Sequence, residues 1–258
     1  MKKIILLNKK EGETPLEALE GFRSRHKEYK NMPMTYAGRL DPMASGLLLI
    51  LTGEECKKKE KYLALGKEYE FEILFGFATD TYDILGKIQP KQHPYKLEFV
   101  RVSELEQKIR KNLKFFTGKF VQKYPMFSSK TVAGKPLFAY AREGVDLPAQ
   151  AGAPERVVNV KNLKFLKIRK ISNKKLLENI ERRVAKVRGD FRQKEILKIW
   201  QKNLKNKKEF FYIAKFKIKC SGGTYVRSIA NFLGEKISIP ALAFSIKRTK
   251  VGKLRKIR

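Results

Sequence analysis

The sequence predicts an α+β fold built around a mixed or antiparallel central sheet that is flanked by helices and loops. Residues 67–77 and 210–220 alternate apolar and polar side chains, which is the pattern of strands with one buried face. Amphipathic helical segments lie between the expected strands, without the strict βαβ alternation of a parallel sheet. With 258 residues, 42% of them hydrophobic, the chain is long enough to bury a substantial core.

The N-terminal half begins with a short buried strand at residues 4–7. Residues 14–17 place a capping Thr, a first-turn Pro and a capping-box Glu in order, which predicts a helix as far as about His26. A loop punctuated by Gly and Pro is expected at 36–46. The other elements expected here are a strand at 47–51, a lysine-rich helix at 54–65, the strand at 67–77 and a polar turn at 79–86.

The C-terminal half continues the mixture of helices and strands. The expected elements are an amphipathic helix at 102–113, irregular chain at 116–134, a short helix at 136–142, strands at 157–168 and 210–220, a helix at 224–237, a last strand at 241–248 and a basic tail at 250–258.

A strongly basic stretch interrupts this half. Residues 161–208 contain 18 Lys and Arg against 4 Asp and Glu. Helical periodicity runs through 175–205, and Gly189 divides it into two helices. Such a helical hairpin is either a grip for an RNA backbone or a solvated structural insertion, and the sequence leaves both open.

The whole chain is basic, with 58 Lys and Arg, 26 Asp and Glu and a formal net charge of +32. Nucleic acid is the usual polyanionic partner of such a protein, although a merely basic soluble protein is the simpler alternative. No apolar run reaches the ~18–20 residues that span a bilayer, and the apolar start is too short for a signal peptide. A cytoplasmic location is therefore expected.

Cysteine and histidine give no sign of a metal centre or a disulfide framework. Cys56, Cys220, His26 and His93 have no metal-ligand spacing. We expect both cysteines to be small buried side chains and both histidines to lie at the surface or against RNA.

The residues with the most chemical interest lie in 36–48, Tyr-Ala-Gly-Arg-Leu-Asp-Pro-Met-Ala-Ser-Gly-Leu-Leu. Asp41 precedes Pro42, so its backbone is biased away from the helical region and it belongs in a loop. Gly38 and Gly46 permit tight turns and close approach of another chain segment. A carboxylate presented in this way can act as a nucleophile or base, although an ordinary Asp-Pro turn is the simpler interpretation of these residues alone.

This segment resembles the signature loop of pseudouridine synthases, and its Pro-Met-Ala-Ser-Gly continuation resembles the TruB branch, the tRNA pseudouridine-55 synthases. Four further segments resemble the same branch in the same order: 9–17, 67–83 with its Lys-Glu-Tyr and Thr-Asp-Thr-Tyr-Asp, 122–144, and 220–229 with its Gly-Gly-Thr-Tyr-Val-Arg. The resemblance implies the pseudouridine synthase fold.

The resemblance also implies roles for individual residues. Asp41 would attack a flipped-out uridine, Tyr69 would stack on the uracil and help to move a proton, and Arg227 would pair with Asp41. The remaining substrate-binding positions would be Tyr36, Gly38, Arg39, Leu40, Tyr225 and Ile246. The reaction breaks a glycosidic C–N bond and re-forms it at carbon, so neither a cofactor nor a metal is expected. The expected partner is the TΨC stem-loop of tRNA, bound by a monomer.

The chain also departs from the family pattern. Tyr36 stands where bacterial members usually have His, and no C-terminal PUA domain is expected, so residues 1–258 are predicted to be one catalytic domain. The basic insertion at about 175–208 is longer than the usual connection, and we hypothesise that it partly replaces that domain as an RNA grip. Alternatives are a synthase for another RNA, such as ribosomal RNA, or a non-catalytic RNA-binding or RNA-folding protein, against which Asp41, Tyr69 and Arg227 argue.

Overall fold

The computed structural model describes residues 2–89, 100–149, 152–205 and 209–255. Its main sheet contains the strands β1 (Ile4–Lys9), β2 (Met34–Ala37), β3 (Ala44–Thr52), β4 (Lys67–Phe75), β5 (Gly118–Lys123), β8 (Glu155–Ser172), β9 (Phe210–Cys220), β10 (Ala241–Val251) and β11 (Leu254–Arg255). A separate small ribbon pairs β6 (Thr131–Val132) with β7 (Lys135–Pro136). The α-helices are α1 (Pro15–Arg23), α2 (Lys59–Leu63), α3 (Val102–Asn112), α4 (Leu137–Glu143), α5 (Asn173–Val184), α6 (Gln193–Leu204) and α7 (Val226–Ile237).

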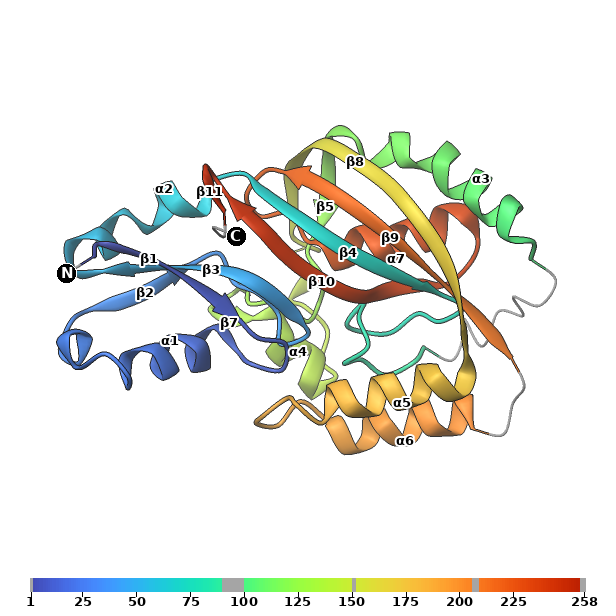
Figure 1. Cartoon of the computed structure of the whole chain (residues 1–258), viewed down its shortest axis with the longest axis horizontal. Coiled ribbons are helices and arrows are strands. Elements are labelled where there is room, and N and C mark those ends of the chain that lie inside the picture. The colour runs from blue at the N-terminus through green and yellow to red at the C-terminus, as the bar shows by residue number, and fades with distance from the viewer. Residues whose placement is uncertain (1, 90–99, 150–151, 206–208, 256–258) are drawn as a thin grey trace.

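The sheet confirms the predicted α+β fold with a mixed centre. Its strands run in the order β1-β3-β10-β4-β9-β8-β5, with β2 beside β3 and β11 beside β10 (Figure 1). The pairing of β3 with β10 is parallel, whereas those of β4 with β9 and β10 are antiparallel. The parallel contact brings the N-terminal strands against the last long strand of the chain.

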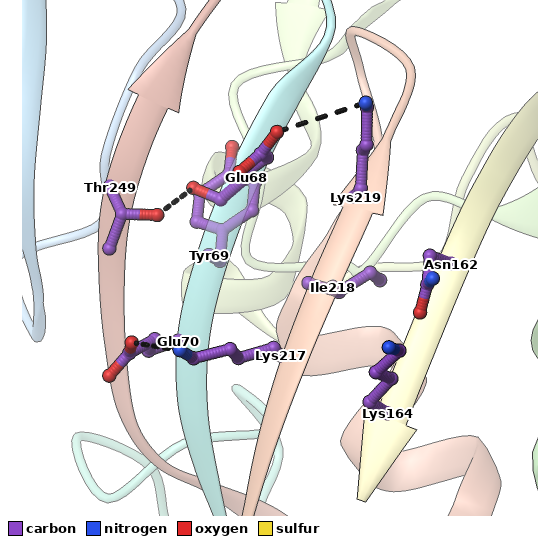
Figure 2. A pocket seen from close by; sticks show the side chains of 9 residues that line it. All are labelled: Glu68, Tyr69, Glu70, Asn162, Lys164, Lys217, Ile218, Lys219 and Thr249. Carbon is purple, nitrogen blue, oxygen red and sulfur yellow. Dashed lines mark hydrogen bonds and ion pairs between the residues drawn. The ribbon is translucent and has the colours of Figure 1, made fainter. Parts of the chain in front are cut away.

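The two faces of the sheet differ because β4 and β9 alternate as expected. Tyr69 and Phe71 are buried on one side, and the ring of Phe71 stacks on that of Phe216 in β9. Helix α7 packs against β10 on this side, and α3 packs against α7. The other face is open and carries Glu70, Lys217 and Lys164 on three adjacent strands (Figure 2). There the Glu70 carboxylate pairs with Lys217 at 3.1 Å.

The predicted capping box at the start of α1 is confirmed. The Thr14 hydroxyl accepts from the Glu17 N–H at 3.1 Å, and the Glu17 carboxylate accepts from the Thr14 N–H at 2.7 Å. The helix ends at Arg23, slightly before the expected boundary, and a 3-10 turn follows at Lys27–Tyr29. His26 stacks on Phe22, so its ring is partly sheltered; His93 lies outside the described residues.

Three expected boundaries are wrong, and strand pairing explains two of them. The loop predicted at 36–46 is shorter, because β2 extends to Ala37 and β3 begins at Ala44. The chain predicted to be irregular at 116–134 contains β5, which forms only because β8 offers a partner along its whole length. In the helix predicted at 54–65, the first turns are a 3-10 helix at Gly53–Lys58 and only Lys59–Leu63 is α-helical.

The basic stretch forms the two predicted helices, α5 and α6, which lie side by side beyond the ends of β8 and β9 (Figure 1). Its inner face is anchored by Trp200, which is fully buried against Phe77 and donates its indole N–H to the Ile84 carbonyl at 3.2 Å. Residues 206–208, at the end of the expected insertion, lie outside the described part. No helix in the described part of the chain is long and apolar enough to cross a membrane.

Candidate active site

Asp41 lies on the short connection between β2 and β3, residues 38–43, which we call the Asp41 connection. Its backbone carbonyl accepts from the Ala44 N–H at 2.9 Å, which closes a turn directly before β3. The neighbouring side chains of Leu40 and Met43 are buried and fix the connection to the core. The Asp41 side chain remains 36% exposed, so a substrate can reach its carboxylate.

The carboxylate of Asp41 pairs with Arg227, in the first turn of α7. The Arg227 Nε donates to Oδ2 at 2.8 Å and Nη2 lies 3.4 Å from Oδ1. The other guanidinium bonds go to backbone carbonyls, from Nη1 to Thr81 at 2.8 Å and from Nη2 to Phe127 at 2.7 Å. All three nitrogens of the Arg227 guanidinium therefore donate hydrogen bonds, and its orientation is set before any ligand binds.

Charge and burial oppose each other at Arg227. Burial alone would lower its pKa, but the adjacent carboxylates of Asp41 and Asp83 raise the pKa above its ordinary value. Burial raises the pKa of Asp83 to about 6, although Arg227 acts in the opposite direction. Asp83 also accepts from the Thr81 hydroxyl at 2.8 Å and the Leu85 N–H at 2.9 Å. One guanidinium thus lies close to two carboxyl groups of different exposure.

Arg248, in β10, fixes the start of the Asp41 connection. It is 1% exposed, and its guanidinium donates to the carbonyls of Leu47 at 2.6 Å and Gly38 at 3.0 Å. The close approach of Arg248 in β10 to β3 requires a glycine at position 46. There φ is +102°, and a Cβ atom would lie 2.2 Å from the Arg248 carbonyl oxygen.

Lys9 supports the other end of the connection. Its buried ammonium donates to the Ala44 carbonyl at 2.6 Å and the Lys10 carbonyl at 2.9 Å. Burial lowers the Lys9 pKa to about 8. The start of β3 is therefore tied to β1 by a side chain as well as by the sheet.

Tyr69 and Ile246 lie on the same face of the sheet as the Arg248 side chain. Tyr69 is paired with Arg248 across β4 and β10, and Ile246 is paired with Phe71 and, on its other side, with Ala44. Burial raises the pKa of the Tyr69 phenol; the Asp41 carboxylate adds to this rise and Arg248 opposes it. The phenol is therefore neutral near pH 7 and within electrostatic reach of Asp41.

The other predicted substrate-binding residues are more dispersed. Tyr225 precedes Arg227 at the start of α7, and its ring lies 5.6 Å from the Arg227 guanidinium. Gly38 adopts a φ of +83° before the Asp41 turn. The Tyr36 ring instead lies close to two cations, 5.7 Å from the exposed Arg39 guanidinium and 5.8 Å from the half-buried Lys59 ammonium.

The sequence interpretation missed Arg248 and Lys9 as site residues and gave Asp83 no role. A signal for Arg248 was available, because a charged residue two positions after Ile246 falls on the buried face of an alternating strand. In the described residues, no group of three or more His, Cys, Asp or Glu side chains could hold a metal ion.

Comparison with known proteins gives a consistent result. A family model described as "TruB family pseudouridylate synthase (N terminal domain)" matches residues 26–181. Two proteins named tRNA pseudouridine synthase B are similar along nearly the whole chain. The one from Caldicellulosiruptor saccharolyticus is 30% identical over 98% of this chain and 68% of its own length, and that from Wigglesworthia glossinidia brevipalpis is 32% identical over 96% and 59%.

Solved structures share the fold. A chain in a crystal structure of a Cbf5-Nop10-Gar1 complex superposes with a TM-score of 0.55 at 16% sequence identity, covering 98% of this chain and 50% of that one. A chain in an H/ACA RNP bound to a substrate RNA gives a TM-score of 0.53. The present chain thus spans between about half and about two thirds of the length of the proteins it matches.

Proposed function

The chain belongs to the TruB family of pseudouridine synthases, and we propose that it isomerises uridine-55 in the TΨC loop of tRNA to pseudouridine, with Asp41 as the nucleophile. The observation that carries the assignment of Asp41 is its ion pair with Arg227. This pair joins two segments, 36–48 and 220–229, that each resemble a signature of the family.

The chemistry is an isomerisation that balances within the nucleotide. The bond between N1 and C1′ breaks, the uracil turns, and C5 bonds to C1′; C5 loses a proton and N1 gains one. A charged carboxylate is needed to attack the nucleotide. Arg227 supports that role because its hydrogen bonds direct both carboxylate oxygens of Asp41.

The target uridine must first leave its stack, which costs a few kcal/mol. An aromatic surface recovers ~1–3 kcal/mol per stacked base. Tyr69 is suited to this task, because its phenol is neutral and its strand neighbour Arg248 holds the Asp41 connection. Ile246, on the same face and next to Ala44, would contact the other side of the base.

Site mapping on a tRNA transcript tests the proposal. Pseudouridine is labelled with a carbodiimide and detected as a primer-extension stop, after incubation with wild type, Asp41→Asn or the control Asp146→Asn, an exposed aspartate. We expect a stop at position 55 with wild type and Asp146→Asn but not with Asp41→Asn. A stop that persists with Asp41→Asn refutes the nucleophile, and no stop on tRNA refutes the substrate and directs the search to ribosomal RNA.

A further inference from the structure

The basic hairpin of α5 and α6 is docked against the segments that build the site. Arg183 in α5 is 6% exposed and forms an ion pair with Glu11 at 2.7 Å. The next residue, Gly12, donates its N–H to the Pro42 carbonyl at 2.9 Å. A Cβ atom on Gly12 would lie 2.7 Å from the Lys186 backbone, so hairpin, N-terminal loop and Asp41 connection are in direct contact.

Arg192, at the start of α6, makes the contacts that matter most for the site. Its Nη1 pairs with the Asp80 carboxylate at 2.8 Å, and its guanidinium lies 4.3 Å from the centre of the Phe127 ring. The Arg192 side chain is only 20% exposed. Its backbone has a φ of +64°, a strained conformation for a residue with a side chain, where glycine would be the ordinary choice.

One partner of Arg192, Phe127, also supplies a carbonyl to Arg227, and the other, Asp80, is the chain neighbour of the second carbonyl ligand, Thr81. Asp80 directly precedes Thr81, whose carbonyl accepts from Arg227 Nη1, and the Phe127 carbonyl accepts from Arg227 Nη2. We propose that Arg192 is a positioning residue, which holds the turn at Thr81 and the segment at Phe127 together and so directs Arg227 toward Asp41. This role rests on the proposed function, since it concerns the same catalytic pair.

Through Arg192, the inner side of the hairpin also helps to position Arg227. A loss of Arg192 frees both segments to relax, and Arg227 then keeps its charge but not its direction. Misplacement of a catalytic group by about 1 Å costs on the order of 10²-fold in rate. The loss therefore appears in the chemical step and not in tRNA affinity.

The test compares Arg192→Gly, which suits the backbone conformation, with Arg192→Lys and the control Arg101→Ala, an exposed arginine outside the hairpin. Three quantities are measured: the single-turnover rate at saturating enzyme, the Kd for tRNA, and hydrogen exchange of residues 79–88 and 124–130. We expect Arg192→Gly to lower the rate by about 10- to 100-fold, to leave Kd within about twofold and to raise exchange in both segments. Arg192→Lys keeps an ion pair with Asp80 and restores part of the rate, and Arg101→Ala behaves as wild type.

The proposal is overturned if Arg192→Gly leaves the rate and the exchange unchanged, or if it weakens tRNA binding at an unchanged rate. The exchange measurement needs no catalysis. A wild-type protein that makes no pseudouridine in tRNA would therefore refute the proposed function, while exchange would still decide whether Arg192 holds the two segments.

Discussion

The side chains of Asp41 and Arg227 are in direct contact although the two residues are 186 positions apart in the sequence. The Arg227 Nε lies 2.8 Å from the Asp41 Oδ2, and the Arg227 Nη2 lies 3.4 Å from Oδ1. The guanidinium also donates hydrogen bonds to the backbone carbonyls of Thr81 and Phe127. A charged partner held in this way needs no reorganisation when the substrate arrives.

Replacement of Arg227 by lysine tests how much this orientation contributes. Lysine retains the charge, but one ammonium cannot reproduce the two contacts with Asp41 and both carbonyl bonds. We expect Arg227→Lys to lower the single-turnover rate by about 10²-fold or more and the free energy of unfolding by about 1–3 kcal/mol. Urea unfolding and single-turnover kinetics measure the two effects, with Lys236→Arg, exposed on the same helix, as the control. Wild-type kinetics in Arg227→Lys would show that the direction of the guanidinium is unimportant.

Arg248 is expected to stabilise the Asp41 connection. Arg248→Met keeps most of the side-chain volume but removes the donors of two carbonyls, the buried one of Leu47 and the partly buried one of Gly38. Each orphaned carbonyl costs about 1–3 kcal/mol, so the free energy of unfolding should fall by about 2–6 kcal/mol. Urea unfolding beside Lys247→Met, an exposed neighbour on β10, measures the loss. Equal stabilities of the two variants would contradict this role.

Asp83 should make stability depend on pH. Burial raises its pKa from 3.8 to about 6, so between these values the folded protein retains a proton that the unfolded chain has released. Stability therefore decreases as pH rises through this window, by at most about 3 kcal/mol, and the penalty is complete above pH 6. Asp83→Asn removes the titration, so its stability relative to wild type should increase from about pH 4 to pH 6 and then level off. Urea unfolding of both proteins across this range is the measurement, and a pH-independent difference would exclude Asp83 as the source.

Local patterns predicted the elements that local interactions determine. The capping box at Thr14 and Glu17 and the alternation of β4 depend on neighbours within a few residues. Strand β5 and the full length of β8 depend on pairing with distant strands, so no short window contains the information.

The same distinction applies to the site. Asp41 and Arg227 were identified through family resemblance, because an Asp-Pro turn and one arginine are ordinary features of a sequence. Arg248 was visible only as a charge on the buried side of a strand. Its contact with Leu47 spans 201 positions, and its contribution follows from the fold.

The outer side of the basic hairpin is the remaining candidate for an RNA grip. Lys194, Lys198 and Lys202 follow one another at four-residue spacing on α6, and all three are exposed. If they contact phosphates, replacing all three with Gln should weaken tRNA binding and lower the slope of log K against log salt by about 2–3, because each lost contact removes roughly 0.7–0.9. The single-turnover rate at saturating enzyme should not change, since the inner contacts of Arg192 are retained.

The matched control replaces Lys161, Lys164 and Lys167 on β8, which removes the same charge from another exposed surface. Unchanged affinity in the hairpin variant would leave the hairpin as a structural brace alone, and an equal loss in both variants would mean that net charge, not the hairpin, attracts the RNA.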